Sequence, residues 1–292
     1  MNLFEKYDSI ALRGSISQFC PPRCFELEGK TFDFAIDCGL ETGDIHLEFV
    51  DRNNVKWSIH SGATTGESSH YEVRKADDDT YLVTYCMDEP RANHTFIIDL
   101  EQGLVTFLRC SLGENPYYPY LIESHWGFGY IKVEGEEHTD IRRHGFTDDV
   151  IGTGVKWNYG HRMATTHIYY SSNWYRIQYS RRSAGTSALG SLMRSLPGPD
   201  EPCYYVKIKE GMYVVSCTEQ NMEKLLGAAP GFRSDTLLFL DNWNRMYSVG
   251  RGYGTATREG TPDREIFCMI GKYASEPELE EHYLTDPNPY LV

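Results

Sequence analysis

The run "MYVVSCTEQN" (212–221) is an alternating strand pattern that ends in an acid. Glu219 falls on the same face as Tyr213, Val215 and Cys217, which is the face that a half-buried strand turns toward the core. A carboxyl group that is withdrawn from water has a raised pKa, and this suits general acid–base chemistry near neutral pH. Glu219 is therefore the first candidate for a proton-transfer group.

Aromatic and polar side chains accompany Glu219 on the alternating faces of the second half of the chain. Tyrosine hydroxyls orient a substrate through hydrogen bonds, and an arginine neutralises a negative group on it. We predict that Tyr159 acts with Glu219 in catalysis, and that the substrate contacts Trp157, His167, Tyr169, Tyr175 and Arg182. In the structural alternative, Glu219 pairs with an arginine at a barrel mouth and the aromatic side chains fill a core.

Motifs for bound cofactors and metals are missing from the sequence. It has no phosphate-binding loop, no dinucleotide fingerprint after a strand and no HExxH motif. The pair Cys20 and Cys24 has no second cysteine or histidine pair at zinc spacing. We therefore expect neither a cofactor nor a metal.

These residues must be positioned by β-strands. The sequence consists of short runs in which apolar and polar residues alternate, and helical periodicity is nearly absent. The series of runs occurs twice in the same order, and "TYLVTYCM" (80–87) matches "MYVVSCTE" (212–219), with Met87 opposite Glu219. The sequence thus predicts an all-β fold, a tandem repeat of two antiparallel lipocalin-like β-barrels. Their boundaries are 1–135 and 136–292, with an insertion at 181–202 in the second barrel. A barrel of about eight strands is large enough to hold one small ligand.

The overall charge limits the choice of partners. The chain has 292 residues and a formal net charge of −14, which argues against nucleic acid and anionic membrane as partners. No signal peptide and no apolar run of membrane-spanning length are recognised, so the expected location is cytoplasmic, with reduced thiols. The expected partner is a small aromatic or conjugated molecule. Self-association as a homodimer is left open.

Two long segments of the second half carry a family resemblance. "RHGFTDDVIGTGVKWNYG" (143–160) opens this half and "CYYVKIKEGMYVVSCTEQ" (203–220) lies inside it. With the doubled layout, they resemble the molybdenum cofactor biosynthesis protein F (MoaF) family over most of the chain. That resemblance implies a role near molybdopterin.

Each half also resembles the barrel of bacterial phenolic acid decarboxylases. "WSIHSG" (57–62) is similar to that family's "YRIHSG", "WYRIQYS" (174–180) shares its opening, and "MYVVSCTEQ" (212–220) is similar to "VYKVSWTEP". The resemblance implies that Glu219 matches the family's proton-transfer glutamate. The family's two substrate-gripping tyrosines fall on Trp157 and Tyr159, so one of them is kept.

The family's arginine is placed differently in this chain. In the decarboxylases a Gly-Arg-Trp sequence follows the "IHSG" stretch, whereas here Gly66 is followed by Glu67. The second half offers Arg181 or Arg182 by proximity. This departure points away from simple cinnamate decarboxylation.

Three functions are compatible with these observations. The leading expectation is a cofactor-independent lyase or isomerase, including a cyclase, that acts on a small aromatic or conjugated substrate in the second barrel. The alternative is a non-catalytic carrier of a hydrophobic or pterin-like ligand. A degenerate structural repeat that serves assembly is the third.

Overall fold

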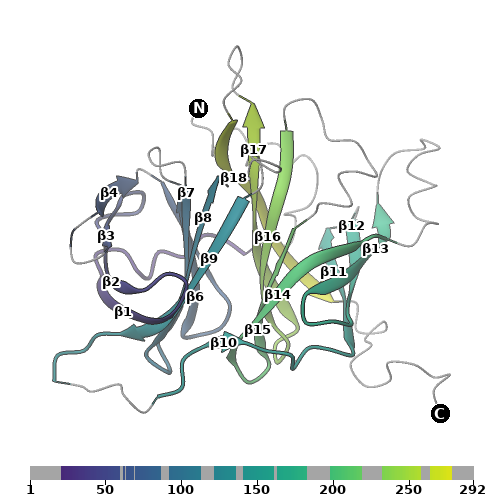
Figure 1. Cartoon of the computed structure of the whole chain (residues 1–292), viewed down its shortest axis with the longest axis horizontal. Coiled ribbons are helices and arrows are strands. Elements are labelled where there is room, and N and C mark those ends of the chain that lie inside the picture. Colours follow the sequence, from purple (N-terminus) through teal and green to yellow (C-terminus); the bar gives the residue numbers. More distant parts are fainter. Residues whose placement is uncertain are drawn as a thin grey trace. The chain divides into compact units, whose positions relative to one another are not determined.

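The computed structural model of the chain is built from β-strands throughout the residues that it describes (Figure 1). At several strand ends and over 252–257 and 264–277 it describes the backbone alone, and Tyr159 and Arg182 are two such positions. The described residues contain no helix that is long and apolar enough to cross a membrane. The predicted all-β class is confirmed. The described residues are 21–59, 62, 64–68, 70–86, 92–112, 122–135, 141–160, 163–182, 198–218, 232–257 and 264–277.

The first nine strands form one antiparallel sheet, called here the first barrel. Their order in the sheet is β4-β3-β2-β1-β9-β8-β7-β6-β5, so β1 pairs with β9, and β4 and β5 are the two edges. Phe32, Phe34 and Ile36 of β1 are buried, because every second side chain of a strand faces the interior. The strands are β1 (Thr31–Gly39), β2 (Gly43–Phe49), β3 (Val55–Ile59), β4 (Thr64–Ser68), β5 (Tyr71–Lys75), β6 (Thr80–Cys86), β7 (Ala92–Asp99), β8 (Leu104–Leu112) and β9 (Ile122–Ile131).

The other nine strands form a second antiparallel sheet, called here the second barrel. Its order is β10-β14-β13-β12-β11-β18-β17-β16-β15, and an additional pairing of β14 with β15 closes the ring. Together the two sheets confirm the predicted tandem of antiparallel barrels. The strands are β10 (Gly145–Phe146), β11 (Thr153–Gly160), β12 (Met163–Tyr169), β13 (Trp174–Arg182), β14 (Asp200–Lys209), β15 (Met212–Cys217), β16 (Phe232–Asn242), β17 (Tyr247–Thr257) and β18 (Arg264–Pro277).

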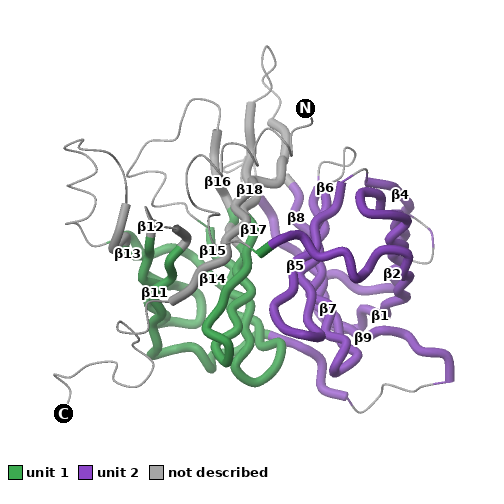
Figure 2. The backbone as a smooth tube through the Cα atoms, turned by 180° about the vertical axis from the view of Figure 1, so that it is seen from behind, with its two compact units in different colours: residues 1–21, 146–254, 269–292 green, residues 22–145, 255–268 purple. Residues whose placement is uncertain are grey.

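The chain divides into two compact units, shown in different colours in Figure 2. Residues 22–145 and 255–268 belong to unit 2, which contains the first barrel. Residues 146–254 belong to unit 1, together with the chain from Met269 onward. The interiors described below each lie within a single unit.

The pairing register makes positions in the two barrels equivalent. Val83 pairs with Phe96 between β6 and β7, and Val215 pairs with Phe239 between β15 and β16. In the same way β1, β2 and β3 correspond to β11, β12 and β13. Because a strand exposes alternate residues on opposite faces, a shared register also means shared inward positions. The two interiors are therefore compared residue by residue below.

The alternation of the sequence predicts seven strands in each half, and four strands of the structure lie outside these predicted runs: β4, β9, β10 and β18. In β9 the glycines at 127 and 129 interrupt the apolar alternation and are typical of a loop. The structure gives a physical reason for Gly129, because a Cβ there would lie 1.9 Å from the carbonyl oxygen of Ala35. The close approach of β9 to β1 thus excludes a side chain at this point of the sheet.

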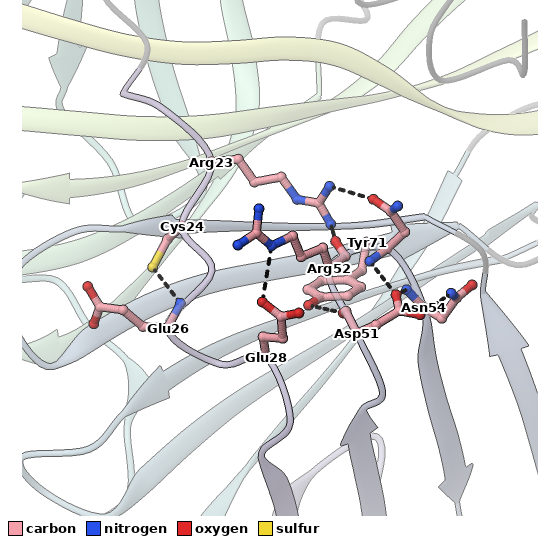
Figure 3. Close-up of polar contacts among 9 residues, drawn as sticks. Arg23, Cys24, Glu26, Glu28, Asp51, Arg52, Asn54 and Tyr71 are labelled. Atoms are coloured by element: carbon pink, nitrogen blue, oxygen red, sulfur yellow. Dashed lines mark hydrogen bonds and ion pairs between the residues drawn. The ribbon is translucent and has the colours of Figure 1, made fainter.

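The segment 21–30 before β1, called here the lead-in segment, is held to one end of the first barrel by polar contacts (Figure 3). The Arg23 guanidinium donates hydrogen bonds to the side chain of Asn53, at 3.2 Å, and to the carbonyl of Arg52. It also lies over the Tyr71 ring, 4.9 Å from the centroid. The Tyr71 hydroxyl donates to the carbonyl of Asp51 at 2.7 Å. The lead-in segment therefore connects the edge strand β5 to the turn between β2 and β3.

The close approach at Gly129 is testable by substitution. Gly129→Ala should lower the free energy of unfolding by about 1–3 kcal/mol, because β9 must move away from the Ala35 carbonyl. Gly145→Ala is the matched control: its Cβ would meet no atom within 4 Å, and a change below about 0.5 kcal/mol is expected. Urea denaturation of the three proteins measures both. Equal stability of the two variants would contradict the packing described for β1 and β9.

Candidate functional site

Four of the predicted substrate-binding residues lie together inside the second barrel. Trp157, Tyr169 and Tyr175 are buried in one cluster, and the His167 ring packs against Tyr175 with centroids 5.3 Å apart. The rings of Tyr169 and Tyr175 are 6.4 Å apart. Strands β11, β12 and β13 supply these side chains from adjacent inward positions, so the alternation in the sequence brings them to one interior.

The structure does not describe the side chains of the other three predicted site residues. Glu219 lies outside the described residues, and the side chains of Tyr159 and Arg182 are not described. β15 ends at Cys217, two positions before the predicted acid. The proposed catalytic roles of Glu219 and Tyr159 and the binding role of Arg182 therefore stay predictions.

An acid that the sequence reasoning missed lies in the same interior. Asp241 on β16 is fully buried, opposite Tyr213, and on the same face as Phe239. The Tyr169 hydroxyl donates to its Oδ2 at 3.4 Å. No hydrogen bond of normal geometry reaches the other oxygen, Oδ1, among the described side chains, but the Ser248 and Trp243 side chains lie close enough to the carboxyl to favour its charged form. Asp241 thus lies inside the barrel with one oxygen held by Tyr169 and with Ser248 and Trp243 close to its carboxyl.

Burial sets the protonation of this acid. It raises the pKa of Asp241 from 3.8 to about 7, because an apolar surrounding disfavours the charged carboxylate. Ser248, Trp243 and Tyr169 face the carboxyl and offset part of the rise. The carboxyl therefore takes up and releases a proton near neutral pH, which is the range that general acid–base catalysis uses.

A chain of polar contacts leads away from Asp241. The Tyr169 hydroxyl is 3.4 Å from Nδ1 of His167, and Nε2 of His167 is 3.1 Å from Oγ1 of Thr165. Burial lowers the pKa of His167 to about 3, so its imidazole is neutral. When Asp241 is protonated, it can donate to Tyr169, and Tyr169 can then donate to His167. The protonation state of the acid is thereby coupled to these two neutral side chains.

A further acid lies on the inner face of β14. Glu201 is fully buried and alternates with Cys203 and Tyr205, both of which belong to the core of this barrel. It pairs with Tyr175 across β13 and β14. The predicted feature, an acid turned into the apolar side of a strand, thus occurs at Glu201 and Asp241.

The equivalent interior of the first barrel is apolar at these positions. By register, His167, Tyr169 and Tyr175 correspond to Leu47, Phe49 and Val55, and Asp241 corresponds to Ile98. All four side chains of the first barrel are buried hydrophobics. A polar set that the fold itself required would be expected in both barrels, so the barrel architecture alone does not account for this one.

The sequence contains a weak signal for Asp241. "LLFLDNWN" (237–244) has a turn-like composition after the apolar run, which indicates a turn residue. In the structure Asn242 has that role, because its Oδ1 accepts a hydrogen bond from the backbone N–H of Arg245. In the first barrel the matching position is Asp99, which accepts from the N–H groups of Glu101 and Gln102. Only the pairing register of β15 with β16 distinguishes the turn residue Asn242 from the interior acid Asp241.

Two antiparallel barrels in tandem, one with a polar cluster in its interior, define the class of protein as a tandem β-barrel, consistent with the lipocalin-like resemblance. The family model of the MoaF N-terminal domain matches residues 4–114. This match supports the predicted resemblance to the MoaF family over residues 4–114, whereas the segments 143–160 and 203–220 lie outside it. No curated protein matches the chain. Among the described residues, no group of three or more histidine, cysteine and acidic side chains lies together as metal ligands would.

The pKa of Asp241 predicts a pH dependence of stability. Its pKa in the folded chain lies above the ordinary value, so folding takes up a proton between about pH 4 and pH 7. The free energy of unfolding of the wild type should therefore fall relative to Asp241→Asn as the pH rises through this window. The expected difference is on the order of 4 kcal/mol.

Urea denaturation from pH 4 to pH 8 measures this difference. Asp200→Asn is the control, because the Asp200 carboxylate pairs with Arg176 at the surface and its pKa is lowered. That pair contributes stability above the ordinary carboxyl pKa and loses it as the pH falls. A wild type and an Asp241→Asn variant with parallel pH profiles would contradict a protonated Asp241.

Proposed function

We propose that the second barrel is a cofactor-independent acid–base enzyme, a lyase or an isomerase that includes cyclases, acting on a small aromatic or conjugated substrate. One observation supports this most: the fully buried carboxyl of Asp241, whose pKa of about 7 lies near neutrality. Buried acids with such values cluster at catalytic sites. We expect the same group to remove a proton from the substrate and to return it elsewhere.

The proposed roles follow from the contacts of each side chain. The Asp241 carboxyl accepts the substrate proton, while Tyr169 holds its Oδ2 at 3.4 Å. Tyr175 orients the substrate through its hydroxyl, and the Trp157 indole stacks on its conjugated part. The neutral His167 accepts or donates a hydrogen bond without adding charge. A substrate proton thus moves to a carboxyl whose surroundings already favour the protonated form.

Glu219 remains a second candidate for the proton-transfer group. The resemblance to phenolic acid decarboxylases favours it, with Tyr159 beside it and Arg182 neutralising an anion on the substrate. Asp241 is supported by its burial and contacts, and Glu219 by sequence similarity. The experiment below separates the two acids.

The alternative function is a carrier of a small hydrophobic or pterin-like ligand. The neutral His167 and the buried tyrosine hydroxyls favour it, because they bind a polar molecule without any chemistry. The MoaF family match is compatible with both functions. We also propose a cytoplasmic location, since the cysteines whose side chains are described, which are Cys24, Cys38, Cys110, Cys203 and Cys217, are free thiols.

Proton exchange into a neutral ketone tests the enzyme without knowledge of its natural substrate. We expect the wild type to accelerate deuterium uptake at the α-carbons of 2-tetralone in D₂O, measured by proton NMR. Asp241→Asn should reduce this rate by about 100-fold or more, because it removes the acceptor of the proton. Asp200→Asn, a surface control, should leave the rate unchanged.

The other outcomes decide between the alternatives. If Glu219→Gln abolishes exchange and Asp241→Asn does not, the proton-transfer group is Glu219. If the wild type binds 2-tetralone and shows no exchange above that of the Asp241→Asn, Glu219→Gln double variant, the carrier function replaces the enzyme.

A further inference from the structure

A second polar set lies inside the first barrel, in the other unit of the chain. His94 on β7 is buried on the inner face, and its Nδ1 is 3.0 Å from the Tyr85 hydroxyl on β6. The Trp57 indole of β3 packs edge-on against the His94 ring, with centroids 5.1 Å apart. Phe107 lies on another side of the imidazole, at 5.2 Å. One imidazole, one phenol and one indole thus meet within an aromatic interior.

All three groups are neutral. Burial lowers the pKa of His94 to about 3 and raises that of Tyr85 well above its ordinary value. A neutral imidazole has one donor and one acceptor nitrogen, and a phenol has one O–H. Whichever of the two donates in the Tyr85–His94 hydrogen bond, the pair keeps one O–H or N–H donor in reserve.

Trp57 contributes a second unused donor. Its indole N–H is buried and has no hydrogen-bond acceptor among the described residues. The indole lies over Gly66 on β4, where an added Cβ would be 2.3 Å from Cζ2 of Trp57. The glycine therefore makes room for this ring. A buried N–H without an acceptor costs stability, and a bound acceptor removes that cost.

The equivalent positions in the second barrel carry none of these groups. By register, Trp57, Tyr85 and His94 correspond to positions 177, 217 and 237. These positions hold Ile177, Cys217 and Leu237. The fold is built without the polar set in one barrel, so the barrel architecture does not require it in the other. Each barrel thus has its own polar interior at different positions.

We propose that the first barrel holds a second binding site, for a neutral planar conjugated molecule that carries a carbonyl or comparable acceptor oxygen. The acceptor oxygen of the ligand accepts one hydrogen bond from the Trp57 N–H. It accepts a second from the O–H or N–H that the Tyr85–His94 hydrogen bond leaves unused. The aromatic side chains Phe96 and Phe107, whose rings are 4.9 Å apart, pack against the planar part. An anionic ligand is disfavoured, because these three polar groups carry no charge and Arg109, which lies opposite His94 on β8, is already paired with Glu41 at 3.1 Å.

This site is separate from the proposed function of the second barrel. Its residues all lie between 57 and 107, within the unit that contains the first barrel. Substitution of Asp241 therefore leaves it intact. The loss of one site is distinguishable from the loss of the other in the full chain.

Binding of 2-acetonaphthone to the full chain, measured by isothermal titration calorimetry, tests the proposal. We use the Asp241→Asn background to reduce the contribution of the second barrel. In that background 2-acetonaphthone should bind at least tenfold more tightly than 2-ethylnaphthalene, which lacks the oxygen, and than the 2-naphthoate anion. Trp57→Phe and His94→Leu should each weaken the binding of 2-acetonaphthone about tenfold.

Gly66→Ala provides a variant that keeps all three polar groups and displaces the Trp57 ring. It should weaken binding at least as much as Trp57→Phe, while far-ultraviolet circular dichroism confirms that each variant is folded. The proposal is overturned by an affinity for 2-acetonaphthone that is unchanged in Trp57→Phe and His94→Leu. It is equally overturned if the chain does not distinguish 2-acetonaphthone from 2-ethylnaphthalene, or binds neither, since the N–H of Trp57 then serves no ligand.

Discussion

The pairing of β14 with β15 is the interaction on which the second barrel depends, because it closes eight strands into a ring. Closure leaves each strand with one face inside, so every second residue shares one enclosed interior. An acid at such a position cannot turn toward water as it would on an open sheet. The fold thus provides the low-polarity surroundings, and the sequence needs only to place an acid at one inward position.

The buried position of Asp241 lowers the stability of the folded chain and also allows the carboxyl to exchange protons near neutral pH. A fully buried carboxyl destabilises the folded chain when it is ionised, and the apolar equivalent Ile98 in the first barrel avoids this cost. In exchange, the group exchanges protons near neutral pH and is coupled to Tyr169 and His167 through hydrogen bonds. Duplication explains how such a change is tolerated, since each barrel has its own core.

Much of the fold and part of the site follow from the two-residue alternation of the sequence. It predicts the paired barrels and the shared interior of Trp157, His167, Tyr169 and Tyr175. β9 was missed because its glycines, required by the close approach to β1, are typical of loops. Asp241 was missed because it precedes a turn, and only cross-strand register distinguishes it from the turn residue that follows. Both β9 and the inward position of Asp241 depend on which strands pair and in which register, and a single sequence does not give this information.

The most direct test of the account is the protonation of Asp241 itself. Difference infrared spectroscopy of the wild type minus Asp241→Asn isolates the carbonyl stretch of the protonated carboxyl as the pH is raised. The account predicts that this band persists from pH 4 to about pH 7 and then disappears as the carboxylate bands grow. A carboxyl that is already ionised at pH 5 would contradict the central claim that the closed barrel keeps this acid protonated.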